Sequence, residues 1–217
     1  MRRLFQEDLQ NLGEQLIEIT HLVSKAMERA YQAFETADVQ LADEVIAADA
    51  AIDRQQVELD EKAIELLALQ GPVASDLRMI VGALRMSTSL ERMGDLARHI
   101  AQLVRLRYPD LVSPPELQHI YAQMAEHTIS IADRLATLLE NRELHLVSEI
   151  TALNDQINQL HASVFAAIAA EEWHASAATT ADVTLTSRYF ERFGDHGVSV
   201  ARKVDYLVTG DWDSRGE

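Results

Sequence analysis

Hydrophobic residues recur at spacings of three and four along most of the chain, which is the pattern of long amphipathic helices. In the first segment the periodic positions are Leu9, Leu12, Leu16, Ile19, Val23, Met27 and Phe34. They predict one helix up to about residue 35. Similar patterns predict five further helices, over about residues 38–70, 75–108, 116–140, 142–171 and 175–208. Strand-like alternation of useful length is missing from the sequence, so we predict no sheet.

The breaks between these segments carry turn and capping signals. Asp38 is a good N-cap type for the second helix, and Ser75 and Asp76 are good cap types for the third. Three of the four prolines fall in 109–115, which makes this stretch the best internal boundary. We therefore predict an all-α protein of two tandem three-helix bundles, one over 1–110 and one over 111–217, each running up-down-up.

An internal duplication supports this division. Residues 91–95 read Glu-Arg-Met-Gly-Asp and residues 191–195 read Glu-Arg-Phe-Gly-Asp, 100 positions apart. Upstream, residues 38–45 align with 143–150 at a separation of 105 positions. Five residues are therefore missing from the second copy between these blocks, and we expect the deletion in an inter-helix loop, where it is best tolerated.

Composition narrows the functional classes. The formal net charge of −16 disfavours binding to nucleic acid and to anionic lipid. The chain has no cysteine, which excludes disulfides, thiolate metal sites and thiol nucleophiles. No apolar run approaches the roughly 18 residues that span a bilayer, and the first residues do not resemble a signal peptide. We expect a cytoplasmic protein that meets the membrane only through its partners.

The repeated motif contains the best candidates for metal ligands. Residues four apart on a helix share a face, so Glu91 lies beside Asp95, and Glu191 beside Asp195. A third pair with this spacing, formed by Asp49 and Asp53, lies on the second predicted helix. If the second and third helices pack with these faces aligned, four carboxylates converge. Such oxygen ligands suit Mg²⁺, Mn²⁺ or iron, and Zn²⁺ is a further candidate.

Other interpretations of the same residues stay open. His99 extends the stripe of Glu91 and Asp95 and could add a nitrogen ligand, whereas Arg92 and Arg98 could neutralise the acids as ion pairs. Gly94 and Gly194 each cost a helix about 1 kcal/mol relative to alanine, which indicates either close helix packing or room for an ion. A ferritin-like di-iron bundle is an alternative, on the spacing of Glu116 with His119 and of Glu171 with His174.

The sequence offers little for catalysis. It contains no phosphate-cradling glycine-rich loop and no Gly-x-Ser-x-Gly elbow. We therefore expect no enzymatic activity. The competing class is a metal-storage bundle or a metal-dependent enzyme that uses the carboxylate clusters.

Taken together, the two repeats with an ExxxD motif on the last helix of each resemble the PhoU family. Further matching stretches are Gly-Pro-Val-Ala-Ser-Asp-Leu-Arg over 71–78 and Ser-Arg-Tyr-Phe-Glu-Arg-Phe-Gly-Asp-His over 187–196. The resemblance implies a negative regulator of the phosphate-starvation response and of phosphate uptake. It implies an adaptor between a sensor histidine kinase and the ATPase of an ABC phosphate transporter, and commonly a homodimer. Several members of the family bind metal clusters at their ExxxD pairs.

The two copies of the motif need not be equivalent. At the separation of 105, Asp49 and Asp53 align with Asn154 and Asn158, so the second copy loses two charges on its fifth helix. Amides attract a hard cation less strongly than carboxylates do. We therefore predict tighter metal binding in the first half of the chain.

Overall fold

Six helices make up the part of the chain that the computed structural model describes, residues 2–72 and 74–210, and this part contains no strand. Their bounds are α1 (Arg2–Thr36), α2 (Val39–Gln70), α3 (Ser75–Arg107), α4 (Pro115–Asn141), α5 (His145–Ala169) and α6 (Ala177–Thr209). The all-α prediction is confirmed. Most of these helix ends lie within one or two residues of the ends predicted from the sequence.

The helix ends show which capping signals operate. Asp38 caps α2 as predicted, because its side chain accepts a hydrogen bond from the backbone N–H of Leu41 at 3.0 Å. The predicted cap of α3 by Ser75 and Asp76 is wrong. The N-cap position is held by Ala74, at a φ of 49° and without a side-chain hydrogen bond, so Ser75 and Asp76 lie inside the first turn. There the charge of Asp76 still favours the helix N-terminus.

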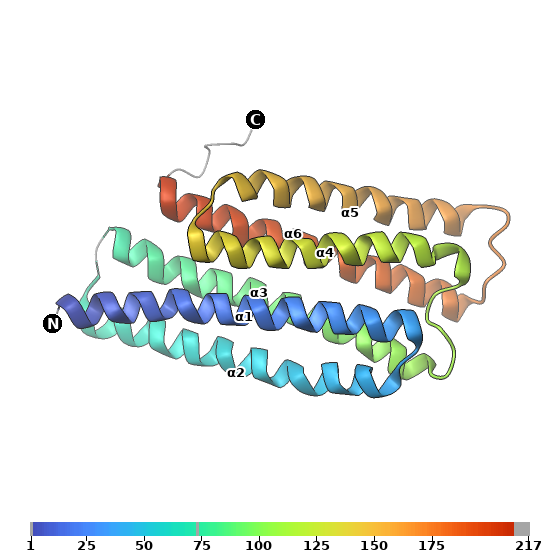
Figure 1. Ribbon diagram of the computed structural model, residues 1–217, viewed down its shortest axis with the longest axis horizontal. Coiled ribbons are helices and arrows are strands. Elements are labelled where there is room, and N and C mark those ends of the chain that lie inside the picture. The colour runs from blue at the N-terminus through green and yellow to red at the C-terminus, as the bar shows by residue number, and fades with distance from the viewer. Residues whose placement is uncertain (1, 73, 211–217) are drawn as a thin grey trace.

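The helices form two bundles that pack side by side (Figure 1). α1, α2 and α3 contact one another, as do α4, α5 and α6, and the bundles meet through α1 against α4 and α3 against α6. Within the described residues, α2 and α5 contact only helices of their own bundle, and they form the two outer edges in Figure 1. The core runs along α1, α3, α4 and α6, whose inward positions are largely Leu, Ile, Val, Met and Ala.

Side-chain contacts fix the direction of the α3–α6 pair. Arg107 at the end of α3 forms an ion pair with the buried Asp182 near the start of α6. At the other end, a Cβ atom on Gly82 would lie 3.1 Å from both Cδ atoms of Leu207. The two helices are therefore antiparallel and closely packed, and their central turns carry the two copies of the repeated motif. In the described ranges, no helix combines the length and the apolar character that crossing a bilayer requires.

The expected place of the five-residue deletion is wrong. The connection between α2 and α3 covers 71–74, whereas the one between α5 and α6 is longer and covers 170–176. The second copy is instead shorter in its helix, since α5 has 25 residues and α2 has 32. Shortening α5 at its exposed C-terminal end removes turns without rotating the residues that precede it, so the buried face of α5 is preserved.

Candidate metal site at the repeated motif

The two motif glycines lie where neighbouring helices cross at close range. A Cβ atom on Gly94 would be 2.8 Å from Cδ1 of Ile52 and 3.4 Å from Oδ1 of Asp49 on α2. A Cβ atom on Gly194 would be 2.2 Å from Oδ1 of Asn154 on α5. Both glycines therefore serve helix packing, and both bring a polar side chain of the neighbouring helix against the motif.

In the first bundle the four predicted ligands gather along the contact between α2 and α3. Asp49 is buried, with 9% of its side chain exposed, and Glu91 and Asp95 are mostly buried, whereas Asp53 is exposed. The sequence thus identifies the correct pair of helix faces. It does not show how the charges of these carboxylates are balanced.

Two arginines of α3 balance them. Arg98 contacts Asp95 and also forms an ion pair with Asp49, with Nε 2.5 Å from Oδ2. Arg92 donates a hydrogen bond from Nη1 to Oδ2 of Asp95 at 2.9 Å. The ion pairs expected from the spacing of Arg92 and Arg98 with Asp95 are therefore formed. The contact between Arg98 and Asp49 was not predicted, because it crosses from α3 to α2.

The pKa values follow from burial and from these neighbours. Burial raises the pKa of Glu91, and the negative charges of Asp95, Asp53 and Asp49 raise it further, against the opposing charge of Arg92. Burial also raises the pKa of Asp49, although Arg98 counteracts it. For Asp95, burial favours a higher pKa, but its contacts with Arg98 and Arg92 outweigh burial and lower the pKa. The four carboxylates are therefore close enough to repel one another.

The second bundle presents a different arrangement around Glu191 and Asp195. The amide of Asn154 donates a hydrogen bond from Nδ2 to Oδ1 of Asp195 at 3.2 Å, and Arg188 pairs with Oε1 of Glu191 at 2.6 Å. Burial, followed by the charge of Asp195, raises the pKa of Glu191. Among the described residues, Oε2 of Glu191 and Oδ1 of Asn154 are buried oxygens without a hydrogen-bond partner. The residue equivalent to Arg98 is Val198, so this bundle has no cation at that position.

The donor atoms suit a hard cation, although their present arrangement does not form a chelate. Within 2–72 and 74–210, no group of three or more His, Asp or Glu side chains is arranged to hold a metal ion. A cation in the first bundle would have to compete with Arg98 for Asp49 and Asp95. In the second bundle it would find two oxygen atoms that no hydrogen bond occupies, but fewer negative charges.

Among the described residues, no histidine completes a metal-binding group with either cluster. His99 packs against the ring of Tyr189 on α6, with the ring centroids 5.2 Å apart, and burial lowers its pKa. The ferritin-like alternative is wrong, because its residues do not point into a bundle. All four are exposed, and two of them lie outside the helices: Glu116, His119, Glu171 and His174.

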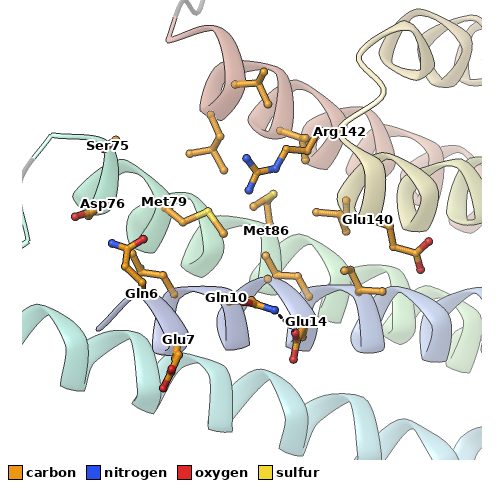
Figure 2. Close-up of a pocket in the computed structure, with 18 residues that line it drawn as sticks. Gln6, Glu7, Gln10, Glu14, Ser75, Asp76, Met79, Met86, Glu140 and Arg142 are labelled. Atoms are coloured by element: carbon orange, nitrogen blue, oxygen red, sulfur yellow. Dashed lines mark hydrogen bonds between the residues drawn. The ribbon is translucent and has the colours of Figure 1, made fainter. Parts of the chain in front are cut away.

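A large cavity lies elsewhere, between the two bundles at the end that holds the start of α1. This end pocket has a volume of about 880 Å³ and is bordered by α1, α3, α4 and α6. Figure 2 shows Gln10 and Glu14 of α1 along one side, Met79 and Met86 of α3 toward the interior, and Arg142 reaching in from the end of α4. The sequence did not indicate this pocket, because it arises from the packing of helices distant in the sequence.

Comparison with known proteins identifies relatives over nearly the whole chain. The family model described as PhoU domain matches twice, over residues 16–104 and 121–204. The phosphate-specific transport system accessory protein PhoU homolog 1 of Mycobacterium leprae is 38% identical over 210 residues, covering 97% of this chain and 95% of the relative. Homolog 2 of Mycobacterium tuberculosis is also 38% identical, covering 97% of this chain and 99% of the relative.

Two solved structures have the same fold. PhoU from Streptococcus pneumoniae superimposes with a TM-score of 0.85 at 24% identity, covering 95% of this chain and 98% of that one. PhoU from Pseudomonas aeruginosa has a TM-score of 0.85 at 23% identity, with coverage of 95% and 100%. The arrangement of two repeated three-helix bundles is thus shared with these proteins.

Proposed function

Because the chain belongs to the PhoU family, we propose that it regulates phosphate uptake and represses the phosphate-starvation response when phosphate is plentiful. Two observations together carry this proposal. The PhoU domain matches this chain twice, and relatives named as accessory proteins of phosphate-specific transport align with it over nearly their full length. We propose that the protein acts in the cytoplasm and without enzymatic activity. In this role it links a sensor histidine kinase to the ATPase of the ABC phosphate transporter, and it does so as a homodimer.

The end pocket offers a surface for such a partner. Its interior is apolar, with Leu16, Met79, Met86 and Leu207 among the lining residues. Its polar border is acidic, with four carboxylates and one arginine: Glu7, Glu14, Asp76, Glu140 and Arg142. Methionine side chains adapt readily to different partners, and an acidic border attracts positive charge. We propose that a basic amphipathic helix of a partner binds here, with its apolar face inside the pocket.

We also propose that the motif carboxylates bind a divalent or trivalent metal ion. The candidate ligands are the six acids predicted from the sequence: Asp49, Asp53, Glu91, Asp95, Glu191 and Asp195. Their convergence in the first bundle and the unpartnered oxygens in the second support the proposal. The ion would stabilise the helix crossings and so the surfaces presented to partners. We expect higher occupancy in the first bundle, and equal occupancy by anomalous scattering would contradict this.

The regulatory role is tested in cells that lack the gene. We expect phosphate-starvation genes to be expressed in phosphate excess, and unchanged repression would refute the role. Expression of the native chain in these cells should restore repression. In a separate experiment, the purified chain should bind both the kinase and the transporter ATPase. Sedimentation of the purified chain tests the homodimer.

A variant that fills the end pocket tests the docking surface without changing the rest of the molecule. Gly13 borders the pocket, and a Cβ atom there would only make ordinary contact with Met79, at 3.9 Å. Gly13→Leu should therefore fill part of the pocket while improving the helix propensity of α1. It should weaken partner binding, whereas the matched control Gly13→Ala should bind like the native chain. Equal binding by both variants would exclude the end pocket as the docking surface.

A further inference from the structure

A smaller pocket on the α3–α6 pair collects positive charge in a strongly acidic protein. It has a volume of about 260 Å³, and three of its lining residues are cations: Arg78 and Arg85 on α3, and Lys203 on α6. Among the described residues that line it there is no Asp or Glu. We call these residues with Tyr206, Gly82, Leu77 and Val81 the cationic pocket. A formal net charge of −16 makes three cations without an acid between them unusual.

Within residues 2–72 and 74–210, no ion pair neutralises these cations. The ion pairs of the described chain engage eight other Lys and Arg residues, and none involves Arg78, Arg85 or Lys203. Lys203 donates hydrogen bonds from Nζ to the carbonyl oxygen and to Oγ of Ser199, at 3.1 and 2.6 Å. An ammonium group has three protons, so one stays available for a ligand.

The packing of α3 against α6 holds the charges together. Lys203 is half-buried, and its pKa is lowered by burial and by the charge of Arg85. Arg78 reaches toward the end of α6, where a Cβ atom on Gly210 would lie 3.3 Å from Nη1. Between them, Gly82 lets Leu207 pack directly on α3. The three cations thus border one cavity, and Arg85 and Lys203 repel each other, so an anion between them would relieve this repulsion.

We propose that the cationic pocket binds a phosphoryl group through Arg78, Arg85 and Lys203. Arginine and lysine are the side chains that recognise phosphoryl oxygens, the first as a bidentate donor and the second as a point charge. The volume lies just below the roughly 300–1,000 Å³ of pockets that enclose drug-sized ligands, which suits a small anion. This site shares no residue with the carboxylate clusters, and it does not depend on the adaptor role.

Two sources can supply this group. Free phosphate would occupy the cavity alone. A phosphorylated lipid headgroup would also place acyl chains near Leu77 and Val81, which border the pocket and are 41% and 38% exposed. The two sources share the phosphoryl group, so one set of variants tests the pocket, and two probes distinguish the sources.

The experiment measures binding to the full-length chain by calorimetry with inorganic phosphate and by sedimentation with vesicles. The vesicles contain phosphatidylglycerol in phosphatidylcholine, or phosphatidylcholine alone, at the same ionic strength. Replacement of both Arg85 and Lys203 by glutamine should weaken binding about tenfold or more, since each removes a charge-assisted hydrogen bond. The control replaces Lys25 and Arg54, exposed on α1 and α2, by glutamine, which removes the same charge outside the pocket.

Each outcome decides the proposal. Phosphate binding that the pocket variant loses and the control keeps supports a site for free phosphate. The same difference with anionic vesicles alone supports a lipid headgroup. Absence of binding by both probes, or equal loss in the pocket variant and the control, overturns the proposal. If thermal unfolding shows that the double variant is destabilised, Arg78→Gln, at an exposed position, must show the loss in its place.

Discussion

The amide of Asn154 donates a hydrogen bond to Oδ1 of Asp195 across the α5–α6 crossing, with 3.2 Å between nitrogen and oxygen. At the equivalent crossing of the first bundle, Asp49 faces Asp95, and Arg98 bridges the two carboxylates. The carboxylates of the two copies of the motif are therefore stabilised by different contacts. One uses a cation between two acids, and the other uses an amide as the donor.

This difference predicts the result of restoring the acid in the second bundle. In Asn154→Asp a carboxylate would face Asp195 beside Glu191, where Val198 provides no cation. We expect the free energy of unfolding to fall by about 1–3 kcal/mol, because a buried donor is replaced by a repelling charge. Urea unfolding measures the change. Asn158→Asp, one turn further along α5 and exposed, is the control and should change stability little. Equal effects of the two substitutions would contradict this account.

Removing Arg98 should favour metal binding in the first bundle. Arg98 occupies the carboxylates of Asp49 and Asp95, so a cation has to displace it. We expect Arg98→Gln to bind Mn²⁺ or Mg²⁺ about tenfold more tightly than the native chain, the equivalent of about one charge-assisted contact. Calorimetric titration of the metal-free protein measures this. Arg105→Gln removes an exposed arginine paired with Asp43 and should leave metal affinity unchanged. An affinity unchanged by Arg98→Gln would show that the carboxylates are not the ligands.

The two motif glycines should respond differently to alanine. In Gly94→Ala the closest atom is the terminal Cδ1 of Ile52, which can move, so the gain in helix propensity of about 1 kcal/mol offsets the crowding. In Gly194→Ala the new methyl group would lie 2.2 Å from Oδ1 of Asn154. Asn154 must then leave Asp195, and we expect a net loss of about 1–3 kcal/mol. Thermal unfolding of the two variants compares them, and equal stability would contradict the prediction.

The sequence predicted the helices and the family far better than it predicted the charge balance of the site. Helix periodicity and the capping signal at Asp38 act over a few residues, so they can be recognised in one sequence. The contact of Arg98 with Asp49 depends on the crossing of two helices. The cationic pocket similarly needs Lys203 to face Arg85 across the α3–α6 pair. Such contacts follow from packing between distant segments, and no spacing rule along one helix reports them.

A partly buried histidine should give the stability of the second bundle a pH dependence. His161 forms a hydrogen bond through Nδ1 with Oγ of Ser187 and packs edge-on against Phe165. Burial and the charge of Arg188 lower its pKa below the ordinary 6.5, although Asp195 opposes them. Because the pKa is lower in the folded state, protonation favours the unfolded chain. The stabilising contribution is therefore complete above about pH 6.5 and is lost as the pH falls from there through the lowered value.

His161→Gln should remove this contribution while keeping a side chain that can hydrogen-bond to Ser187. We expect the difference in free energy of unfolding between the native chain and the variant to shrink as the pH is lowered from 7.5 to about 5. Comparing the two chains at each pH cancels the opposite trend from Asp49, Glu91 and Glu191, whose raised pKa values favour the folded state on acidification. His119→Gln, at an exposed position on α4, should follow the native profile. A constant difference between the native chain and His161→Gln across this range would show that His161 does not titrate differently in the two states.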